Sequence, residues 1–256
     1  YKRQEFIQLA KLAAFEAGKE IMKIYETDFS VETKPDDSPL TLADKAAHKK
    51  ILTFLKKTNI PILSEEGKHL VYSKRKKWNS FWLVDPLDGT KEFVKRNGEF
   101  TVNIALIHNN EPVIGVIYVP VQDVMYYSNE QNAYKVENYS CSPLEYSLPL
   151  KNDRKQFVIV GSRSHMSKET ELFFEEMRKS HEEIELLAVG SSLKLCMVAE
   201  GKADVYPRYA PTMEWDTGAG HALVKAAGFR VLQYQSENEL VYNKENLLNP
   251  WFLVKK

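Results

Sequence analysis

The chain opens with two segments in which apolar positions recur three and four residues apart. Residues 4 to 26 place charged side chains between the apolar ones, which predicts one amphipathic helix with a single buried face. The same pattern returns over residues 41 to 57. There Thr41 is the expected N-cap, because Asp44 stands three positions later, as in a capping box. The start of the chain is therefore predicted to form a pair of helices.

Short apolar runs bounded by turn residues follow these helices, and such runs are typical of β-strands. The runs are residues 60–63, 81–84, 100–107, 113–119 and 124–127. Turn residues such as Asn109 and Pro120 separate them, which predicts the strands of one sheet.

The pattern changes after residues 140 to 154, a polar segment that contains Pro143 and Pro149 and is the expected boundary. Beyond it, strand-like runs alternate with helix-like runs, which is typical of an α/β arrangement. The expected strands are residues 157–160, 185–189 and 203–206, and the expected helices are residues 168–179, 192–200 and 216–227. We therefore predict an α/β protein in which an α+β half, residues 1–148, packs on an α/β half, residues 149–256.

Composition narrows the class of protein. With 256 residues, 43% of them hydrophobic, the chain is long enough for a substantial core. Its 35 basic and 35 acidic residues cancel, so no nucleic-acid partner is expected, and the basic run at residues 74–77 is predicted to be a solvated loop. Cys141 and Cys196 are too few for a disulfide framework and no secretory pattern stands near the start, which favours the cytoplasm. No apolar run reaches the roughly 18 residues of a spanning helix, while a peripheral membrane contact stays open.

The clearest chemical signal is an apolar strand that runs into two aspartates, Asp85 and Asp88. Pro86 between them has no N–H for a ladder hydrogen bond, so we expect the chain to leave the sheet there. Two carboxylates about 4 Å apart repel each other by about 4 kcal/mol at an effective dielectric constant of about 20. A half-buried pair should therefore take up a proton or bind a cation.

Further acidic residues stand at the ends of other predicted elements. Glu65 and Glu66 follow a strand, and Asp216 stands where the N-cap of a helix is expected. Every candidate ligand is an oxygen atom, and the carbonyl of Leu87 is another candidate. Such a set favours Mg²⁺ or Mn²⁺ over zinc.

Two glycine-containing segments are candidate phosphate sites. Gly89 beside Thr90 would let a phosphate approach the backbone closely. In the second half, Gly190, Ser191 and Ser192 precede a helix and could offer backbone amides to an anion, with Lys194 one turn into that helix. Each feature also has a plain alternative, namely a turn, a helix cap or a solvated charge.

Three strings together resemble the signature motifs of the inositol monophosphatase superfamily. They are Glu65-Glu66, Asp85-Pro86-Leu87-Asp88-Gly89-Thr90 and Trp215-Asp216-Thr217-Gly218-Ala219-Gly220. Other strings are similar to the bacterial 3'(2'),5'-bisphosphate nucleotidases within that superfamily, and the resemblance covers nearly the whole chain. They include Ser162-Arg163-Ser164-His165, Gly190-Ser191-Ser192-Leu193-Lys194 and Tyr206-Pro207-Arg208. Gly218 departs from the pattern, since related sequences often carry alanine there.

The resemblance implies the layered αβαβα sandwich of the inositol monophosphatase and fructose bisphosphatase type. It also implies two or three Mg²⁺ ions, with Mn²⁺ as an alternative and Li⁺ as an inhibitor. The implied metal ligands are Glu65, Asp85, the Leu87 carbonyl, Asp88 and Asp216. Asp44 and Thr90 would orient and deprotonate the attacking water, and with Glu65 they form the implied catalytic set.

The implied reaction is hydrolysis of adenosine 3',5'-bisphosphate to AMP and phosphate. The implied substrate-binding residues are Gly89, Thr90, Ser164, His165, Gly190, Ser191, Lys194 and Arg208. The protein would work as a monomer or a homodimer, in the cytoplasm or on the cytoplasmic face of the inner membrane. An inositol monophosphatase or sugar phosphatase on the same scaffold is the first alternative. A non-catalytic nucleotide-binding protein is the second, although a pure binder need not retain both a metal cluster and a water-activating group.

Overall fold

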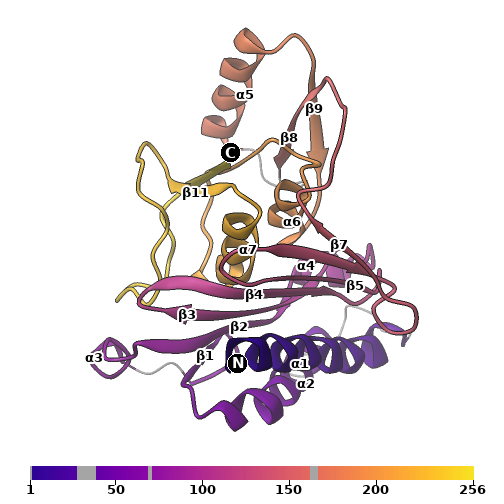
Figure 1. The fold of residues 1–256 in the computed structure, drawn as a ribbon, viewed down its shortest axis with the longest axis vertical. Helices are drawn as coiled ribbons and strands as arrows, with labels where there is room; N and C mark the ends of the chain where they lie inside the picture. Colours follow the sequence, from indigo (N-terminus) through magenta and orange to yellow (C-terminus); the bar gives the residue numbers. More distant parts are fainter. Residues whose placement is uncertain (1, 28–38, 69–70, 162–166) are drawn as a thin grey trace.

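Two helices cover one face of a mostly antiparallel sheet. The structure, a computed structural model, describes residues 2–27, 39–68, 71–161 and 167–256 (Figure 1). Helices α1 (Lys2–Tyr25) and α2 (Pro39–Leu55) pack side by side against this sheet, which confirms the predicted helix pair. Small side chains in the buried stripe of α1 let the helix approach its neighbours closely. They are Ala10, Ala13, Ala14 and Ala17.

The start of α2 differs from the prediction. The helix begins at Pro39, so Thr41 lies inside it and is not its N-cap. Proline suits the first turn because its φ angle is already helical and its missing N–H would have no partner there. Asp44 is therefore no capping-box residue, and its burial in the second turn needs another explanation.

The first sheet holds the strands of the first half in sequence order. It has seven strands in the described part of the chain, with β1 parallel to β2 and all later neighbours antiparallel. The strands are β1 (Ile62–Ser64), β2 (Ser80–Asp88), β3 (Thr101–His108), β4 (Glu111–Val119), β5 (Val124–Ser128), β6 (Ala133–Glu137) and β7 (Leu144–Leu148). The last two were not predicted, and β7 lies within the segment that was expected to be a boundary loop. Its residues are mostly exposed, so it lacks the apolar run that reveals a strand.

The second sheet belongs to the second half of the chain. Its order is β11-β12-β10-β8-β9, with β8, β9 and β10 parallel and β12 antiparallel to both of its neighbours. The strands are β8 (Phe157–Gly161), β9 (Ile184–Ala188), β10 (Val205–Arg208), β11 (Arg230–Gln233) and β12 (Phe252–Lys255). The chain passes from one sheet to the other between Leu148 and Phe157, while a division into two domains stays a prediction.

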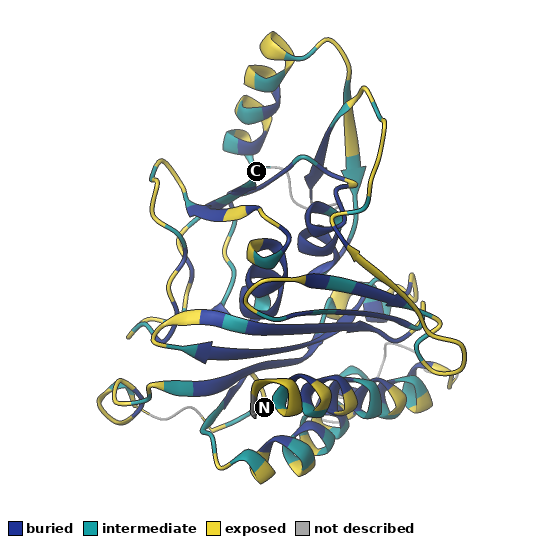
Figure 2. Ribbon diagram, in the orientation of Figure 1, coloured by how far each residue is buried: buried dark blue, intermediate teal, exposed yellow. Residues whose placement is uncertain are grey.

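Three helices of the second half complete the layers. Helices α6 (Leu193–Ala199) and α7 (Glu214–Ala226) lie between the two sheets, and α5 (Lys168–Ser180) lies beyond the second sheet (Figure 1). The order helix, sheet, helix, sheet, helix confirms the predicted sandwich. The interior layer is buried almost all round, whereas α5 exposes its outer face (Figure 2).

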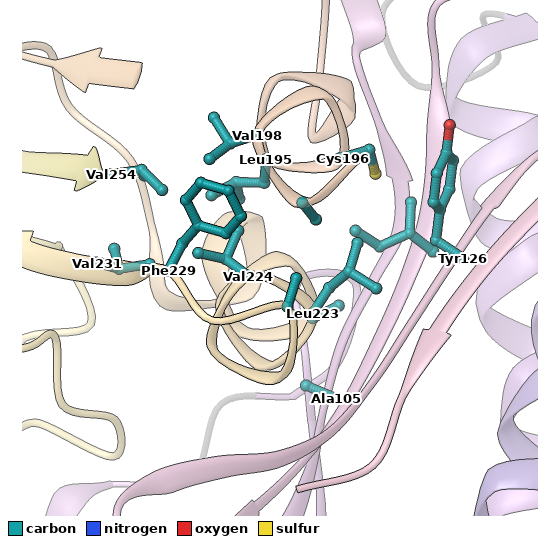
Figure 3. Packing of buried hydrophobic residues seen from close by; sticks show 14 of the residues in the cluster. Ala105, Tyr126, Leu195, Cys196, Val198, Leu223, Val224, Phe229, Val231 and Val254 are labelled. Carbon is teal, nitrogen blue, oxygen red and sulfur yellow. The ribbon is translucent and has the colours of Figure 1, made fainter. Parts of the chain in front are cut away.

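The interior helices join the two sheets through one apolar core. Side chains of α6 and α7 contact Ala105 and Tyr126 of the first sheet and Val231 and Val254 of the second (Figure 3). The helix side chains labelled there are Leu195, Cys196, Val198, Leu223 and Val224. The two halves therefore share a core, which fixes how the site between them is assembled.

Short elements escaped the sequence analysis, and one changes a prediction. Helices α3 (Tyr72–Arg75) and α4 (Thr90–Val94) are too short for a periodic signal. The side chain of Arg75 in α3 is buried, so the prediction of a solvated loop at residues 74–77 is wrong for this residue. The Arg75 guanidinium donates to Asn243 Oδ1 at 3.0 Å and to the Glu245 carbonyl at 2.8 Å.

Within the described ranges, every helix is too short or too polar to span a bilayer.

Candidate metal and phosphate site

A bulge in strand β2 places two carboxylates on one face of the sheet. Asp85 pairs with Asn103 and Asp88 pairs with Thr101, and the register shifts between them. The expectation that the chain leaves the sheet at Pro86 is therefore wrong, because one extra residue is absorbed and pairing resumes. Asn103 and Thr101 are two positions apart and share a face, so their partners Asp85 and Asp88 share it too.

Three carboxylates from different elements converge beside this bulge. Glu65, Asp85 and Asp216 each offer an oxygen, and these oxygens all lie within 4.8 Å of one another. Glu65 directly follows β1, and its N–H donates to the Val84 carbonyl at 3.1 Å. Asp85 is buried and Glu65 is exposed, so the cluster opens towards solvent.

Asp216 reaches the cluster from the first turn of α7. The N-cap of this helix is Met213, so Asp216 is the third helical residue and not the cap that was predicted. Its Oδ2 accepts the N–H of Met213 at 2.8 Å, which pairs one of the free amides at the helix start. This hydrogen bond helps to fix the side chain of Asp216 within the cluster.

Burial makes this group of carboxylates difficult to ionise together. Burial raises the pKa of Asp85 well above its usual range, and the nearby Asp88, Glu65, Asp216 and Asp44 raise it further. Burial, with the charge of Asp88 next in importance, raises the pKa of Asp216 to about 7. At neutral pH such a cluster is stable only with bound protons or a bound cation.

The residues fit a hard divalent cation. The converging donors are carboxylate oxygens from three elements, and His and Cys are absent from the group among the described residues. Oxygen-only donors at this charge density match Mg²⁺ or Mn²⁺. Leu87 is buried in the bulge, and its carbonyl as a further ligand remains a prediction.

Asp88 stands beside the three carboxylates and is already engaged by the protein. Its Oδ2 accepts the Ser192 hydroxyl at 2.6 Å and lies 3.4 Å from the amide nitrogen of Asn103. Only the backbone of Ser192 was predicted to take part in a site, and no role was predicted for its hydroxyl or for Asn103. A buried asparagine inside the apolar run of β3 was the signal that could have identified one of them.

Asp44 lies next to the acidic cluster on helix α2. Its Oδ1 is buried and has no hydrogen-bond partner among the described residues. Burial raises the pKa of Asp44 to about 8, and the carboxylates of Glu66 and Glu65 add to the effect. Thr90 is the exposed first residue of α4, a helix that contacts α2. The helices that carry Asp44 and Thr90 thus contact each other, while a shared role of the two residues stays a prediction.

Gly89 is required by the backbone between Asp88 and Thr90. Its φ of 93° is in the left-handed region, and an added Cβ would lie 3.0 Å from both the Glu99 carbonyl and Ser191 Cβ. The segment that follows β2 therefore packs directly against the loop that precedes α6.

A cavity of about 250 Å³ joins the two loops to the acidic cluster. Predicted site residues that line it are Asp88, Gly89, Thr90, Gly190, Ser191, Lys194, Arg208 and Asp216. Two predicted substrate residues, Ser164 and His165, lie outside the described residues.

Two cationic side chains line this cavity. Lys194 is buried, which lowers its pKa to about 8, and its Nζ donates to the Ser191 carbonyl at 2.6 Å. Arg208 donates to the Pro211 carbonyl at 3.1 Å, and its buried Nε has no hydrogen-bond partner among the described residues. Acidic and basic groups thus line one small cavity, an arrangement suited to a metal-bound phosphate with a second anionic group.

Comparison with known proteins matches nearly all of the chain. The profile of the inositol monophosphatase family matches residues 2–251. The 3'(2'),5'-bisphosphate nucleotidase CysQ of Salmonella typhimurium is 45% identical over 96% of this chain and 98% of its own length. The enzyme of the same name from Escherichia coli K12 is 43% identical over the same shares.

Solved structures agree with this result. CysQ from Bacteroides thetaiotaomicron, described as a bacterial member of the inositol monophosphatase family, has a TM-score of 0.93 and 50% identity. It covers 98% of this chain and 97% of its own. An inositol monophosphatase from Zymomonas mobilis has a TM-score of 0.77 at 20% identity, covering 98% of this chain and 92% of its own, which supports the fold alone.

Proposed function

This chain belongs to the inositol monophosphatase family, and from that premise we propose that it is a 3'(2'),5'-bisphosphate nucleotidase. It would hydrolyse adenosine 3',5'-bisphosphate to AMP and phosphate. The observation that carries the proposal is the convergence of Glu65, Asp85 and Asp216 beside a cavity that Lys194 and Arg208 also line. The relatives that share most of the chain bear the name of this activity.

The family is metal-dependent, and the proposal assigns the ions to the acidic cluster. Glu65, Asp85, the Leu87 carbonyl, Asp88 and Asp216 would hold two or three Mg²⁺ ions, with Mn²⁺ as a substitute. Bound there, the ions supply Lewis-acid polarisation of the phosphoryl group and acidify a water molecule. Li⁺ would inhibit by occupying one of the positions.

Asp44 and Thr90 would handle the proton of the attacking water. Asp44 has an unpartnered buried oxygen among the described residues and a pKa raised to about 8 by burial, so it can accept a proton near neutral pH. Thr90 lines the cavity and would fix the orientation of the water. Glu65 would serve both as a ligand and as part of this catalytic set.

Substrate choice would come from the second half of the chain. Lys194 and Arg208 bring positive charge to the cavity that Asp88 and Asp216 also line, where they would pair with the phosphate that is not cleaved. Gly190 and Ser191, with Gly89 on the other side, would shape the site around the scissile phosphate. Ser164 and His165 would complete the nucleotide contacts.

The proposal includes a small-molecule substrate and a cytoplasmic location. The balanced charge gives no field for nucleic acid, and both Cys141 and Cys196 are free thiols.

A phosphate-release assay tests the function directly. The purified protein should release phosphate from adenosine 3',5'-bisphosphate with Mg²⁺, lose this activity with a chelator, and be inhibited by Li⁺. Inositol 1-phosphate and fructose 1,6-bisphosphate belong in the same assay. Faster turnover of either one would assign the protein to the inositol or sugar phosphatases, and nucleotide binding without turnover would make it a binding protein.

The cavity lysine separates these substrates further. Lys194→Ala should raise KM for the bisphosphate nucleotide far more than KM for inositol 1-phosphate, which has no second phosphate. Lys155→Ala serves as the matched control, because Lys155 is an exposed lysine in the segment that connects β7 to β8. Equal losses on both substrates would refute the assigned role of Lys194.

A further inference from the structure

The hydroxyl of Ser192 links the Asp88 carboxylate to the second half of the chain. Ser192 Oγ lies 2.6 Å from Asp88 Oδ2, 2.9 Å from Asn103 Nδ2 and 3.0 Å from the Asp216 carbonyl. Ser192 and Asn103 are 89 positions apart in sequence, and Ser192 and Asp88 are 104 apart. Only the packing of the two halves brings these atoms together.

A chain of donors and acceptors fixes the direction of each hydrogen bond. The Thr101 hydroxyl donates to Asn103 Oδ1 at 3.0 Å, which turns the amide nitrogen of Asn103 towards Ser192. Ser192 Oγ accepts from that amide, and its single proton has two acceptors, Asp88 Oδ2 at 2.6 Å and the Asp216 carbonyl at 3.0 Å, of which the shorter contact favours Asp88. Thr101, Asn103 and Ser192 are 0%, 1% and 3% exposed, so water does not compete for these bonds.

Helix capping does not explain the hydroxyl. Ser192 occupies the N-cap position of α6, where a serine side chain usually accepts an N–H of the first turn. Here its backbone angles are φ −70° and ψ −3°, and the side chain makes no capping hydrogen bond. The hydroxyl is therefore directed away from its own helix and towards Asp88.

The loop that carries Ser192 is held at a second point. Glu99 Oε2 accepts the N–H of Gly190 at 2.8 Å. A Cβ at Gly190 would lie 2.5 Å from Glu92 Cγ, so the loop approaches the α4 side of the site as closely as a glycine allows. The same loop leads to Lys194, which lines the cavity two positions beyond Ser192.

We propose that Ser192, itself oriented by Asn103, is a positioning residue for Asp88. It engages Oδ2, leaves Oδ1 for a cation, and couples cation binding to the loop that precedes Lys194. This inference rests on the proposed role of Asp88 as a metal ligand. Hydrogen-bonding partners that orient metal ligands typically change metal affinity or activity by about 10- to 100-fold when they are removed.

Two readouts on the full-length protein test this role. Ser192→Ala should raise the Mg²⁺ concentration for half-maximal phosphate release by about 10-fold. It should also reduce the rise in Tm that a fixed, subsaturating Mg²⁺ concentration produces, a measurement that needs no substrate. Ser128→Ala is the matched control, because Ser128 is a buried serine of β5 whose Oγ has no hydrogen-bond partner among the described residues. It should leave both readouts unchanged.

Further variants separate orientation from simple loss of stability. Asn103→Ala should shift the Mg²⁺ requirement in the same direction, and the double variant with Ser192→Ala should lose less than the product of the two single effects. Ser192→Thr keeps a hydroxyl and should restore part of the wild-type Mg²⁺ requirement.

An unchanged Mg²⁺ requirement in Ser192→Ala, within twofold and with a lowered Tm, would show that the residue is only structural. A wild-type protein whose Tm rises with Mg²⁺ but which does not cleave the bisphosphate nucleotide would refute the proposed function. The positioning role would then still be decided by the Tm readout. A wild-type protein whose Tm does not respond to Mg²⁺ would overturn the positioning role as well.

Discussion

Two buried acidic regions of the molecule, one at Glu200 and one at Asp85, differ in the source of their counter-charge. The Glu200 side chain is fully buried and lies 3.3 Å from Lys135 Nζ and 2.8 Å from Lys202 Nζ, with the Tyr126 hydroxyl also donating to it. By contrast, among the described residues the charged neighbours that shift the pKa of Asp85 are other carboxylates.

The comparison separates a structural charge from a functional one. A buried carboxylate that only joins elements is supplied with donors by its own chain, as Glu200 is where it ties α6 to β5 and β6. Glu214 follows the same rule, because Lys244 Nζ lies 2.7 Å from its carboxylate. Asp85 accepts the N–H of Leu87 at 3.1 Å, but the charged groups that shift its pKa among the described residues are all acidic, which favours a bound proton or a bound cation there.

The largest expected effect is on catalysis, from neutralising a carboxylate of the region at Asp85. Asp85→Asn should lower kcat/KM by about 1000-fold, equivalent to about 4 kcal/mol of transition-state stabilisation, because a metal ligand is lost. The metal-free protein should be as stable as the wild type or more stable, since a repelled carboxylate is removed. Steady-state kinetics with saturating Mg²⁺ and thermal melts with a chelator measure both, and near-normal turnover would show that Asp85 holds no essential ion.

The paired region should respond in the opposite way. Glu200→Ala should lower the free energy of unfolding by about 3 kcal/mol, because Lys135 and the Tyr126 hydroxyl lose a buried partner. The Mg²⁺ requirement of the folded protein should stay at the wild-type value. Denaturant unfolding and Mg²⁺ titrations of activity check this, and a Mg²⁺ requirement that rises with the loss of stability would remove the distinction between the regions.

The pH dependence of stability distinguishes the regions without mutation. In the folded protein the pKa of Asp216 is raised to about 7 and that of Asp44 to about 8, mainly by burial, whereas aspartate in unfolded chains titrates near about 4. Folded-state pKa values above the unfolded ones stabilise at low pH, and this stability is lost as pH rises through about 4 to 8.

The metal-free protein should therefore lose about 2 kcal/mol, or about 5 °C in Tm, between pH 5.5 and pH 8.5. Mg²⁺ should remove most of this difference, because the ion replaces the protons. Melts with chelator and with Mg²⁺ at both pH values measure it. If the protein with chelator were more stable at pH 8.5 than at pH 5.5, the pKa values of these carboxylates would not be raised by folding.

The smallest expected effect is on KM for the bisphosphate nucleotide, and it comes from the charge of Lys194 in the cavity. Burial lowers the pKa of Lys194 to about 8, so it loses its charge as pH rises above that value. KM for the bisphosphate nucleotide should rise about 10-fold between pH 7 and pH 9, equivalent to about 1.4 kcal/mol. Lys194→Arg keeps its charge over this range and should show a flatter profile. A flat wild-type profile would remove Lys194 from phosphate binding.

The sequence pattern predicted the long elements and the short strands that are apolar runs, such as β1 and β8, but it failed on other short ones. Helix α1 and strands β3 and β4 carry enough apolar residues to be read directly from the sequence. Strand β7 is mostly exposed, and β11 has only four residues, so neither leaves a distinct pattern. Their positions are set by pairing with distant neighbours, which a local pattern does not contain.

The site was predictable to the extent that its residues stand at the ends of elements or match family motifs. Asp85 and Glu65 follow apolar runs, and the structure brings them together with Asp216. The prediction that Asp216 is the N-cap was wrong by three residues. The N-cap is Met213, which lacks the short polar side chain that usually marks this position. The roles of the Ser192 hydroxyl and of Asn103 were missed because they depend on a contact between the two halves.

The extra residue in β2 restricts any attempt to shorten or transplant this site. In a regular strand, residues three positions apart face opposite sides, and only the bulge lets Asp85 and Asp88 share one side. Deleting a single residue between them would restore regular pairing and keep both aspartates opposite Asn103 and Thr101, but it would remove Pro86 or Leu87, and with Leu87 its candidate carbonyl ligand. A designer who grafts these aspartates onto another sheet must therefore transfer the irregular backbone together with the side chains.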